Sequence, residues 1–199
     1  MSPRIWRHSM VRGLQRRADT PPPAPEPGTT AADDDSATAR AELAALTVPS
    51  FEHPEHLATA LADARRHFLL VTPHLRTAVI TDVLIGRLKN LLRRRDMTAR
   101  IAFGLGRSDH DPEALNRLQR LADTHHNLTL VRVDEPLPHD LIYDDTWVNT
   151  SFDWLSYRGG PARVYRREEG TLIRAAAAVD DRHATCAAII DAAITTHHP

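Results

Sequence analysis

Residues 138–173 hold a group of polar side chains that could act together on a substrate. The group consists of His139, Ser151, Asp153 and Glu168, together with Arg158, Arg163 and Arg166. Guanidinium groups bind oxyanions through two parallel hydrogen bonds, so the three arginines are candidates for holding a phosphate group. This stretch is therefore the strongest candidate for a functional site in the sequence.

Other patterns that could carry chemistry are weaker. The adjacent pairs His125–His126 and His197–His198 point in different directions on regular structure, and no carboxylate–histidine spacing beside them predicts a metal site. The Gly-Leu-Gly sequence at 104–106 lacks the third glycine and the acidic partner of a dinucleotide-binding turn. A run of arginines could form a basic patch for a phosphate backbone, although charges at helix ends are usually just solvated. These arginines are Arg87, Arg93, Arg94, Arg95 and Arg100.

The sequence Ser-Phe-Asp-Trp-Leu-Ser-Tyr-Arg-Gly at 151–159 resembles the second half of the HKD motif of the phospholipase D superfamily. The family pattern is H-x-K-x4-D-x6-G-S-x-N, followed by an apolar stretch. The likeness is to the single-motif, nuclease-like bacterial branch, in which an acidic residue such as Glu168 precedes a Gly-Thr-Leu run. The resemblance covers roughly residues 50–195 and implies an α/β fold.

The resemblance also implies a chemistry and a partner. A histidine nitrogen attacks the phosphodiester to form a phosphohistidine, and a lysine compensates the charge on the phosphate oxygens. A second histidine, from a second copy of the motif, protonates the leaving oxygen, so a homodimer is expected. No metal and no cofactor take part. By resemblance His139 is the nucleophile, Ser151 supports the phosphate site and Glu168 orients a histidine.

The motif of this chain departs from the family pattern at essential positions. Leu141 stands where the pattern requires lysine, and Lys89, the one lysine of the chain, lies on an expected helix 50 residues before His139. His139 and Ser151 are separated by 12 positions instead of the 15 of the pattern. An alignment anchored on Asp144 instead moves His139 to the lysine position and Leu137 to the nucleophile position. Either alignment loses one essential group.

Two further substitutions affect the same site. Thr150 replaces the motif glycine, and Asp153 replaces the motif asparagine, where a carboxylate would repel a phosphate. The first hypothesis is therefore a catalytically degenerate phosphodiesterase that is retained for binding nucleic acid or a partner protein. The alternative is an active homodimeric phosphodiesterase in which an arginine replaces the lysine. A third hypothesis is a decayed fragment with no selected role.

The periodicity of the chain predicts the elements that would position this site. Helices are expected at 39–46, 55–67, 79–92 and 179–195, and a further helix begins at Pro112. Strands are expected at 67–72, 100–103 and 127–133, followed by a hairpin of 141–143 and 147–151 and by strand-like sequence at 163–174. Alternating strands and helices with a late hairpin predict an α/β fold, with a mixed sheet flanked by helices on both faces. Trp154, Leu155 and Tyr157 are expected in the core rather than as a platform for stacking bases.

Composition limits the remaining alternatives. The chain has 199 residues and a net charge of −1 with neutral histidines, so it has room for one domain and a tail and no overall field for nucleic acid or a membrane surface. Its single cysteine, Cys186, excludes an intramolecular disulfide. No apolar run approaches the roughly 18 residues of a membrane span, and we expect a cytoplasmic protein.

The first 38 residues are expected to form a disordered tail. Residues 1–20 are basic and have no continuous apolar segment, and residues 21–37 are rich in proline, acidic and small residues, which is typical of a linker. The phospholipase D-like domain is therefore expected to span residues 39–199.

Overall fold

The computed structural model describes residues 45–106, 110–156 and 168–197. The tail expected over residues 1–38 lies outside these ranges. The elements are β1 (Leu46–Pro49), η1 (Ser50–Glu52), α2 (His53–Asp63), β2 (His67–Thr72), α3 (Asp82–Leu92), β3 (Thr98–Gly104), α4 (Pro112–Thr124), β4 (Leu128–Val133), β5 (His139–Tyr143), β6 (Thr146–Thr150), β7 (Glu169–Ile173) and α5 (Ala176–His197).

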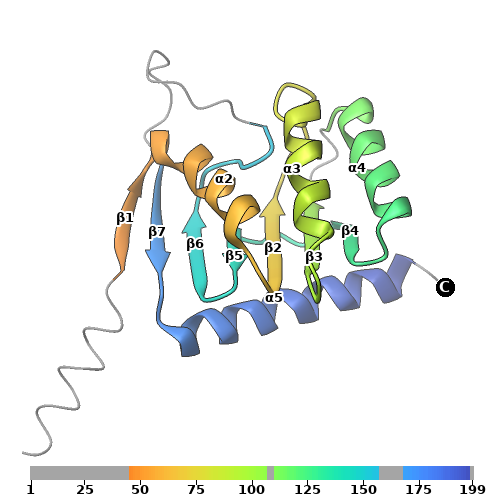
Figure 1. The fold of residues 1–199 in the computed structure, drawn as a ribbon. Helices are drawn as coiled ribbons and strands as arrows, with labels where there is room; N and C mark the ends of the chain where they lie inside the picture. The colour runs from red at the N-terminus through yellow and green to blue at the C-terminus, as the bar shows by residue number, and fades with distance from the viewer. Residues whose placement is uncertain (1–44, 107–109, 157–167, 198–199) are drawn as a thin grey trace, which may run out of the picture.

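The strands form one mixed sheet in the order β1-β7-β6-β5-β2-β3-β4. Strands β2, β3 and β4 are parallel and are connected through helices, whereas β5, β6, β7 and β1 pair antiparallel with their neighbours. Helices α2, α3 and α4 cover one face of the sheet and α5 runs across the other (Figure 1). The expected mixed α/β sheet with helices on both faces is confirmed.

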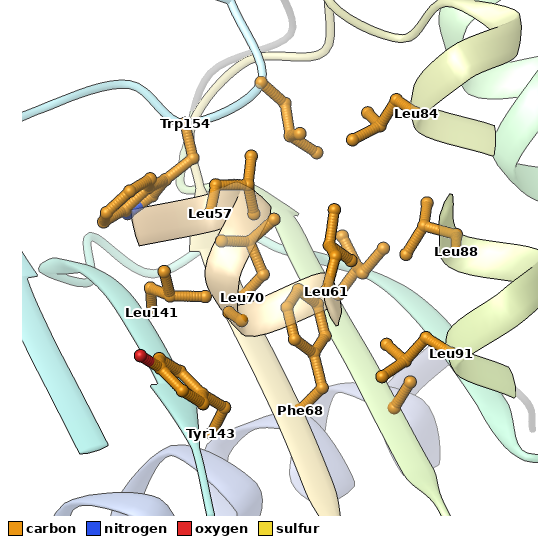
Figure 2. Close-up of a cluster of buried hydrophobic side chains, with 14 of the residues drawn as sticks. Leu57, Leu61, Phe68, Leu70, Leu84, Leu88, Leu91, Leu141, Tyr143 and Trp154 are labelled. Carbon is orange, nitrogen blue, oxygen red and sulfur yellow. The ribbon is translucent and has the colours of Figure 1, made fainter. Parts of the chain in front are cut away.

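Alternation along the central strands divides the core into two parts. On β2, Phe68 and Leu70 pack beneath α2 and α3, while Leu69 and Val71 face α5. Figure 2 shows the first part, in which leucines from α2 and α3 converge on the sheet. Trp154 and Leu155 join this cluster with 1% and 2% of their surface exposed, so their expected place in the core is confirmed. Tyr157 lies outside the described residues.

Local sequence accounts for the ends of several elements. Helix α3 begins after Thr81, whose hydroxyl accepts a hydrogen bond from the Leu84 N–H at 3.5 Å, and α4 begins with Pro112 in its first turn. Strands β5 and β6 are joined by Asp144 and Asp145, with Asp144 at a φ of 46°. The Asp144 carboxylate accepts hydrogen bonds from the backbone N–H groups of Arg65 and Arg66 at 2.7 and 2.8 Å. The hairpin turn is thereby tied to the chain that enters β2.

The helix expected at 39–46 is wrong at its C-terminal end, because Leu46 begins strand β1. Leu46 pairs with Leu172 and Pro49 with Glu169, so a partner strand far along the chain determines this structure. The helix expected at 55–67 ends at Asp63, and His67 instead begins β2. The strand-like sequence at 163–174 contains β7 over Glu169–Ile173.

Candidate functional site

The mixed topology brings several strand ends to one edge of the sheet. Because β5 runs antiparallel to β2, the start of β5 lies beside the end of β2. The end of β6 pairs with that start, His139 with Thr150, and the beginning of β7 pairs with the end of β6, Gly170 with Thr150. Side chains just outside these strand ends therefore meet, although they are far apart in the sequence.

A pocket of about 260 Å³ lies at this edge. It is lined by Pro73, His74, Leu105, Pro136, Leu137, His139, Ser151, Asp153 and Glu168. The four residues that the sequence singled out at 139, 151, 153 and 168 are thus brought together. The three arginines expected to bind phosphate, Arg158, Arg163 and Arg166, lie outside the described residues.

Asp153 is held by a network of hydrogen bonds rather than facing the pocket as a free carboxylate. Its Oδ2 accepts from His74 Nδ1 at 2.5 Å and from the Ser156 hydroxyl, and its Oδ1 accepts from the Thr72 hydroxyl at 2.7 Å. Asp153 and His74 each keep 18% of the side chain exposed. The carboxylate therefore fixes the segment after β6 to the end of β2 and orients the His74 ring.

His139 is oriented by the backbone. Its Nδ1 donates to the Phe152 carbonyl at 3.0 Å, which leaves Nε2 without the ring proton in the neutral tautomer. Ser151 is exposed at the rim, and Glu168 is half-buried with its N–H donating to the Ser50 hydroxyl at 2.8 Å. An imidazole with a free Nε2 can act as a nucleophile, a base or a ligand for an anion once it is protonated.

The position at which the family pattern requires lysine belongs to the core. Leu141 pairs with Leu70, has 0% of its surface exposed and packs in the cluster beneath α2 (Figure 2). The intervening Asp140 points to the other face, where its carboxylate accepts from Arg182, Trp147 and Asn149. Neither residue lines the pocket.

The alternative alignment takes Asp144 as the motif aspartate, but this residue does not line the pocket. Asp144 sits in the β5–β6 turn, at the opposite end of β5 from His139. The backbone N–H groups of Arg65, Arg66 and His67 hold the pKa of its carboxyl below the ordinary range, against an opposing effect of burial. Asp144 is thus a structural residue of the turn.

The histidine His53 is buried and packs against Phe152, whose carbonyl orients His139. Its Nδ1 donates to the Pro49 carbonyl at 3.1 Å, its Nε2 accepts from the Thr150 hydroxyl at 2.8 Å, and its ring stacks on Phe152 at 4.5 Å. The same Thr150 hydroxyl accepts from the Phe152 N–H at 2.9 Å. Burial lowers the pKa of His53. This network fixes the Phe152 carbonyl that orients His139.

Sequence reasoning missed His74 and His53. His74 follows Pro73 directly after the buried strand β2, and a polar residue just past a strand end is a weak signal that many loops share. His53 is the first residue of α2 and precedes Pro54, and this position predicts a residue at the helix end rather than a buried ring. Only the assembled sheet shows that His74 lines the pocket and that His53 packs against Phe152, whose carbonyl accepts from His139.

The described lining of the pocket contains two carboxylates and two imidazoles and no lysine or arginine. Within the described ranges no three histidine, cysteine or acidic side chains are grouped so that they could hold a metal ion. Across the same residues, no helix combines the length and the apolar character that crossing a membrane requires.

The mixed sheet with helices on both faces is similar in fold to solved structures, one of which is described as a phospholipase D family member. No family model and no curated protein matches this sequence. Solved structures do match: NucT from Helicobacter pylori superimposes with a TM-score of 0.55 at 10% identity, over 75% of this chain and 97% of NucT. Nuc from Salmonella typhimurium, a phospholipase D family member, gives 0.53 at 12% identity, over 74% and 94%.

A third similar structure is the phosphatidylserine synthase of Haemophilus influenzae Rd KW20. It superimposes with a TM-score of 0.52 at 11% identity, over 68% of this chain and 34% of the synthase. At such identities the likeness concerns the fold alone. The chain thus spans nearly all of NucT and Nuc and about a third of the synthase.

Proposed function

We propose that this chain is a catalytically degenerate phospholipase D-like domain, retained for binding a ligand or a partner rather than for turnover. The observation that carries the proposal is the burial of Leu141, whose side chain fills the core at the position of the family's lysine. A cation attached there would lie beneath α2 and could not reach a phosphate in the pocket.

The charges of the pocket support the same proposal. Phosphoryl transfer through a histidine requires fixed positive charge where the phosphate oxygens gain negative charge. The described residues that line the pocket include the acidic Asp153 and Glu168 and no arginine or lysine. His139 is suitably oriented as a nucleophile, but the groups that would stabilise the attack are absent from this described lining.

The test is a phosphodiesterase assay on single-stranded DNA, double-stranded DNA and a fluorogenic diester. We expect wild-type, His139→Ala and His126→Ala proteins to give the same rate as buffer; exposed His126 is the matched control. Acid-quenched samples should show no phosphoryl adduct by mass spectrometry. Turnover that His139→Ala abolishes and His126→Ala preserves would overturn the proposal.

The second candidate is an active homodimeric phosphodiesterase of the cytoplasm. The observation that favours it is the free Nε2 of His139 in a pocket shared with Ser151 and Glu168. In this case each of the two chains would contribute one His139, and arginines from 157–167 would replace the lysine. Light scattering after size exclusion separates the candidates, because a strict monomer with diester turnover contradicts the dimeric mechanism.

A further inference from the structure

Among the described helices, α5 is the one that covers the second face of the sheet (Figure 1). The helical members of the core on this face are Val179, Cys186 and Ile190, and all three belong to α5. They pack on apolar strand residues that include Leu69 and Ile142. Release of α5 would therefore expose a contiguous apolar surface of the sheet.

A pair of histidines forms one of the contacts between α5 and this face. His67 begins β2, at the opposite end of that strand from the pocket, and its ring centroid lies 4.3 Å from that of His183 on α5. Both residues are half-buried, and Nε2 of His67 is buried without a hydrogen-bond partner among the described residues. A protonated imidazole carries an N–H donor on each nitrogen, and a buried donor without an acceptor is costly. The contact therefore suits uncharged rings.

The charges that face His67 do not compensate a proton on its ring. Burial has the largest effect and lowers the pKa of His67, and the carboxylates of Asp144 and Asp180 oppose this effect only in part. Asp144 already accepts hydrogen bonds from the backbone N–H groups of Arg65, Arg66 and His67, and Asp180 on α5 is exposed to solvent. The guanidinium of Arg66 acts in the same direction as burial.

The same holds for His183. Burial lowers its pKa, the ring of His67 and the guanidinium of Arg100 lower it further, and Asp180 opposes them only in part. Arg100 donates to Asp191 of α5 at 2.9 Å, so its positive charge is held beside the helix. A proton on one ring also disfavours a proton on the other, because two cations would then face each other in the same contact.

We propose that His67 and His183 form an acid-sensitive contact that holds α5 on the sheet at neutral pH and releases it in acid, while the rest of the sheet stays folded. This role is separate from the pocket and goes beyond the proposed function. Two ion pairs oppose release, Arg182 with Asp140 and Arg100 with Asp191, so the released form is rare at neutral pH. Protons shift this equilibrium because the released form binds them more tightly.

Acid favours release because both pKa values are lowered in the closed form. In the released form the two rings regain the ordinary histidine pKa of about 6.5. Release therefore takes up protons as the pH falls below this value. The equilibrium constant for release should rise by up to about tenfold per pH unit for each proton that is taken up.

Hydrogen exchange followed by mass spectrometry tests the proposal segment by segment. After correction for the intrinsic pH dependence of exchange, we expect the protection of amides in α5 to fall by about tenfold or more between pH 7.5 and pH 5, relative to amides in α3 on the other face. Binding of the dye ANS should increase over the same range, because the apolar face of the sheet becomes exposed.

Glutamine variants test whether the two rings cause the effect. His67→Gln and His183→Gln each keep a polar side chain that does not take up a proton. Each variant should be folded at pH 7.5, as circular dichroism will show, and should lose most of the difference in α5 protection between the two pH values. The matched control is His126→Gln at an exposed position, which should keep the wild-type response.

The remaining outcomes contradict the proposal. Equal loss of protection in α5 and α3 would mean that acid unfolds the whole domain rather than releasing one helix. Unchanged protection of α5 at pH 5, or a full response in His183→Gln, would show that the histidine pair does not control the helix. None of these results depends on diester turnover, so the proposed function and this inference can fail separately.

Discussion

Substituting Leu141 by lysine restores the family's cation at the position where the pattern requires it. In this structure the ammonium group would be buried, because Leu141 has 0% of its surface exposed and packs against the cluster beneath α2. Burial lowers the pKa of a lysine by up to about 3–5 units, and each unit corresponds to about 1.4 kcal/mol. At pH 7 this cost is limited to the roughly 3.4 units between pH 7 and the unfolded pKa of about 10.4, so we expect Leu141→Lys to lower the free energy of unfolding by about 4–5 kcal/mol, without any gain of phosphodiesterase activity.

Urea denaturation followed by circular dichroism measures this loss, and Leu141→Met is the matched control, since that swap costs less than about 1.5 kcal/mol. The lysine variant has a second signature. Its folded-state pKa is lowered below the unfolded value of about 10.4, so its stability relative to wild type should recover by up to about 1.4 kcal/mol per pH unit as the pH rises between these two values. A variant as stable as Leu141→Met, with no such recovery, would mean that the side chain reaches solvent or the pocket. The same result with a gain of diester turnover would refute both the burial argument and the proposed function.

Three further predictions concern the supports of the site and of the sheet. Asp140→Ala should lower the free energy of unfolding by about 1–3 kcal/mol in urea titrations, because it leaves Trp147 Nε1, the Asn149 amide and the part-buried Arg182 without their buried acceptor; no loss of stability would contradict this. Gly170→Ala should cost about 1–3 kcal/mol in the same assay, since the added Cβ would lie 2.7 Å from His53 Nε2, and an unchanged midpoint would contradict the packing described. Three histidines have a pKa lowered chiefly by burial: His53, His67 and His183. Because their unfolded forms bind protons more readily, stability should be complete above about pH 6.5 and fall as the pH drops below it, and a flat profile between pH 7 and pH 5 in thermal unfolding would contradict the shifts.

Periodicity predicted the sheet and the helices because the sequence of each central strand reflects how deeply that strand is buried. Strand β2 is a short apolar run closed by Pro73, and β5 and β6 flank the two aspartates of a hairpin turn, so local sequence is sufficient. Strand β1 has four residues and follows alanine-rich sequence, and its structure depends on pairing with β7. A local pattern carries no information about a partner 126 positions away at Leu46 and Leu172.

The sequence predicted the candidate site only in part, because a local pattern does not show which distant residues meet. Residues at 139, 151, 153 and 168 could be singled out from the motif, and the structure brings them to one pocket, although their roles stay predictions. The sequence also indicated that Asp153 is unsuited to facing a phosphate. It could not show that this carboxylate is occupied by His74, because that contact joins residues 79 positions apart through the pairing of β2 with β5.

The position of Leu141 also explains why one substitution cannot rebuild the family's site. Alternation on β5 puts residues 139 and 141 on the α2 face of the sheet, but only His139, at the strand end, lies at the edge where the pocket opens. Leu141 lies two residues further along β5, where Leu57 and Trp154 belong to the cluster that encloses it (Figure 2). A cation there needs a gap between α2 and the sheet, and that gap is filled by the side chains that stabilise the fold. Loss of the lysine and close packing of α2 are therefore one property of this chain.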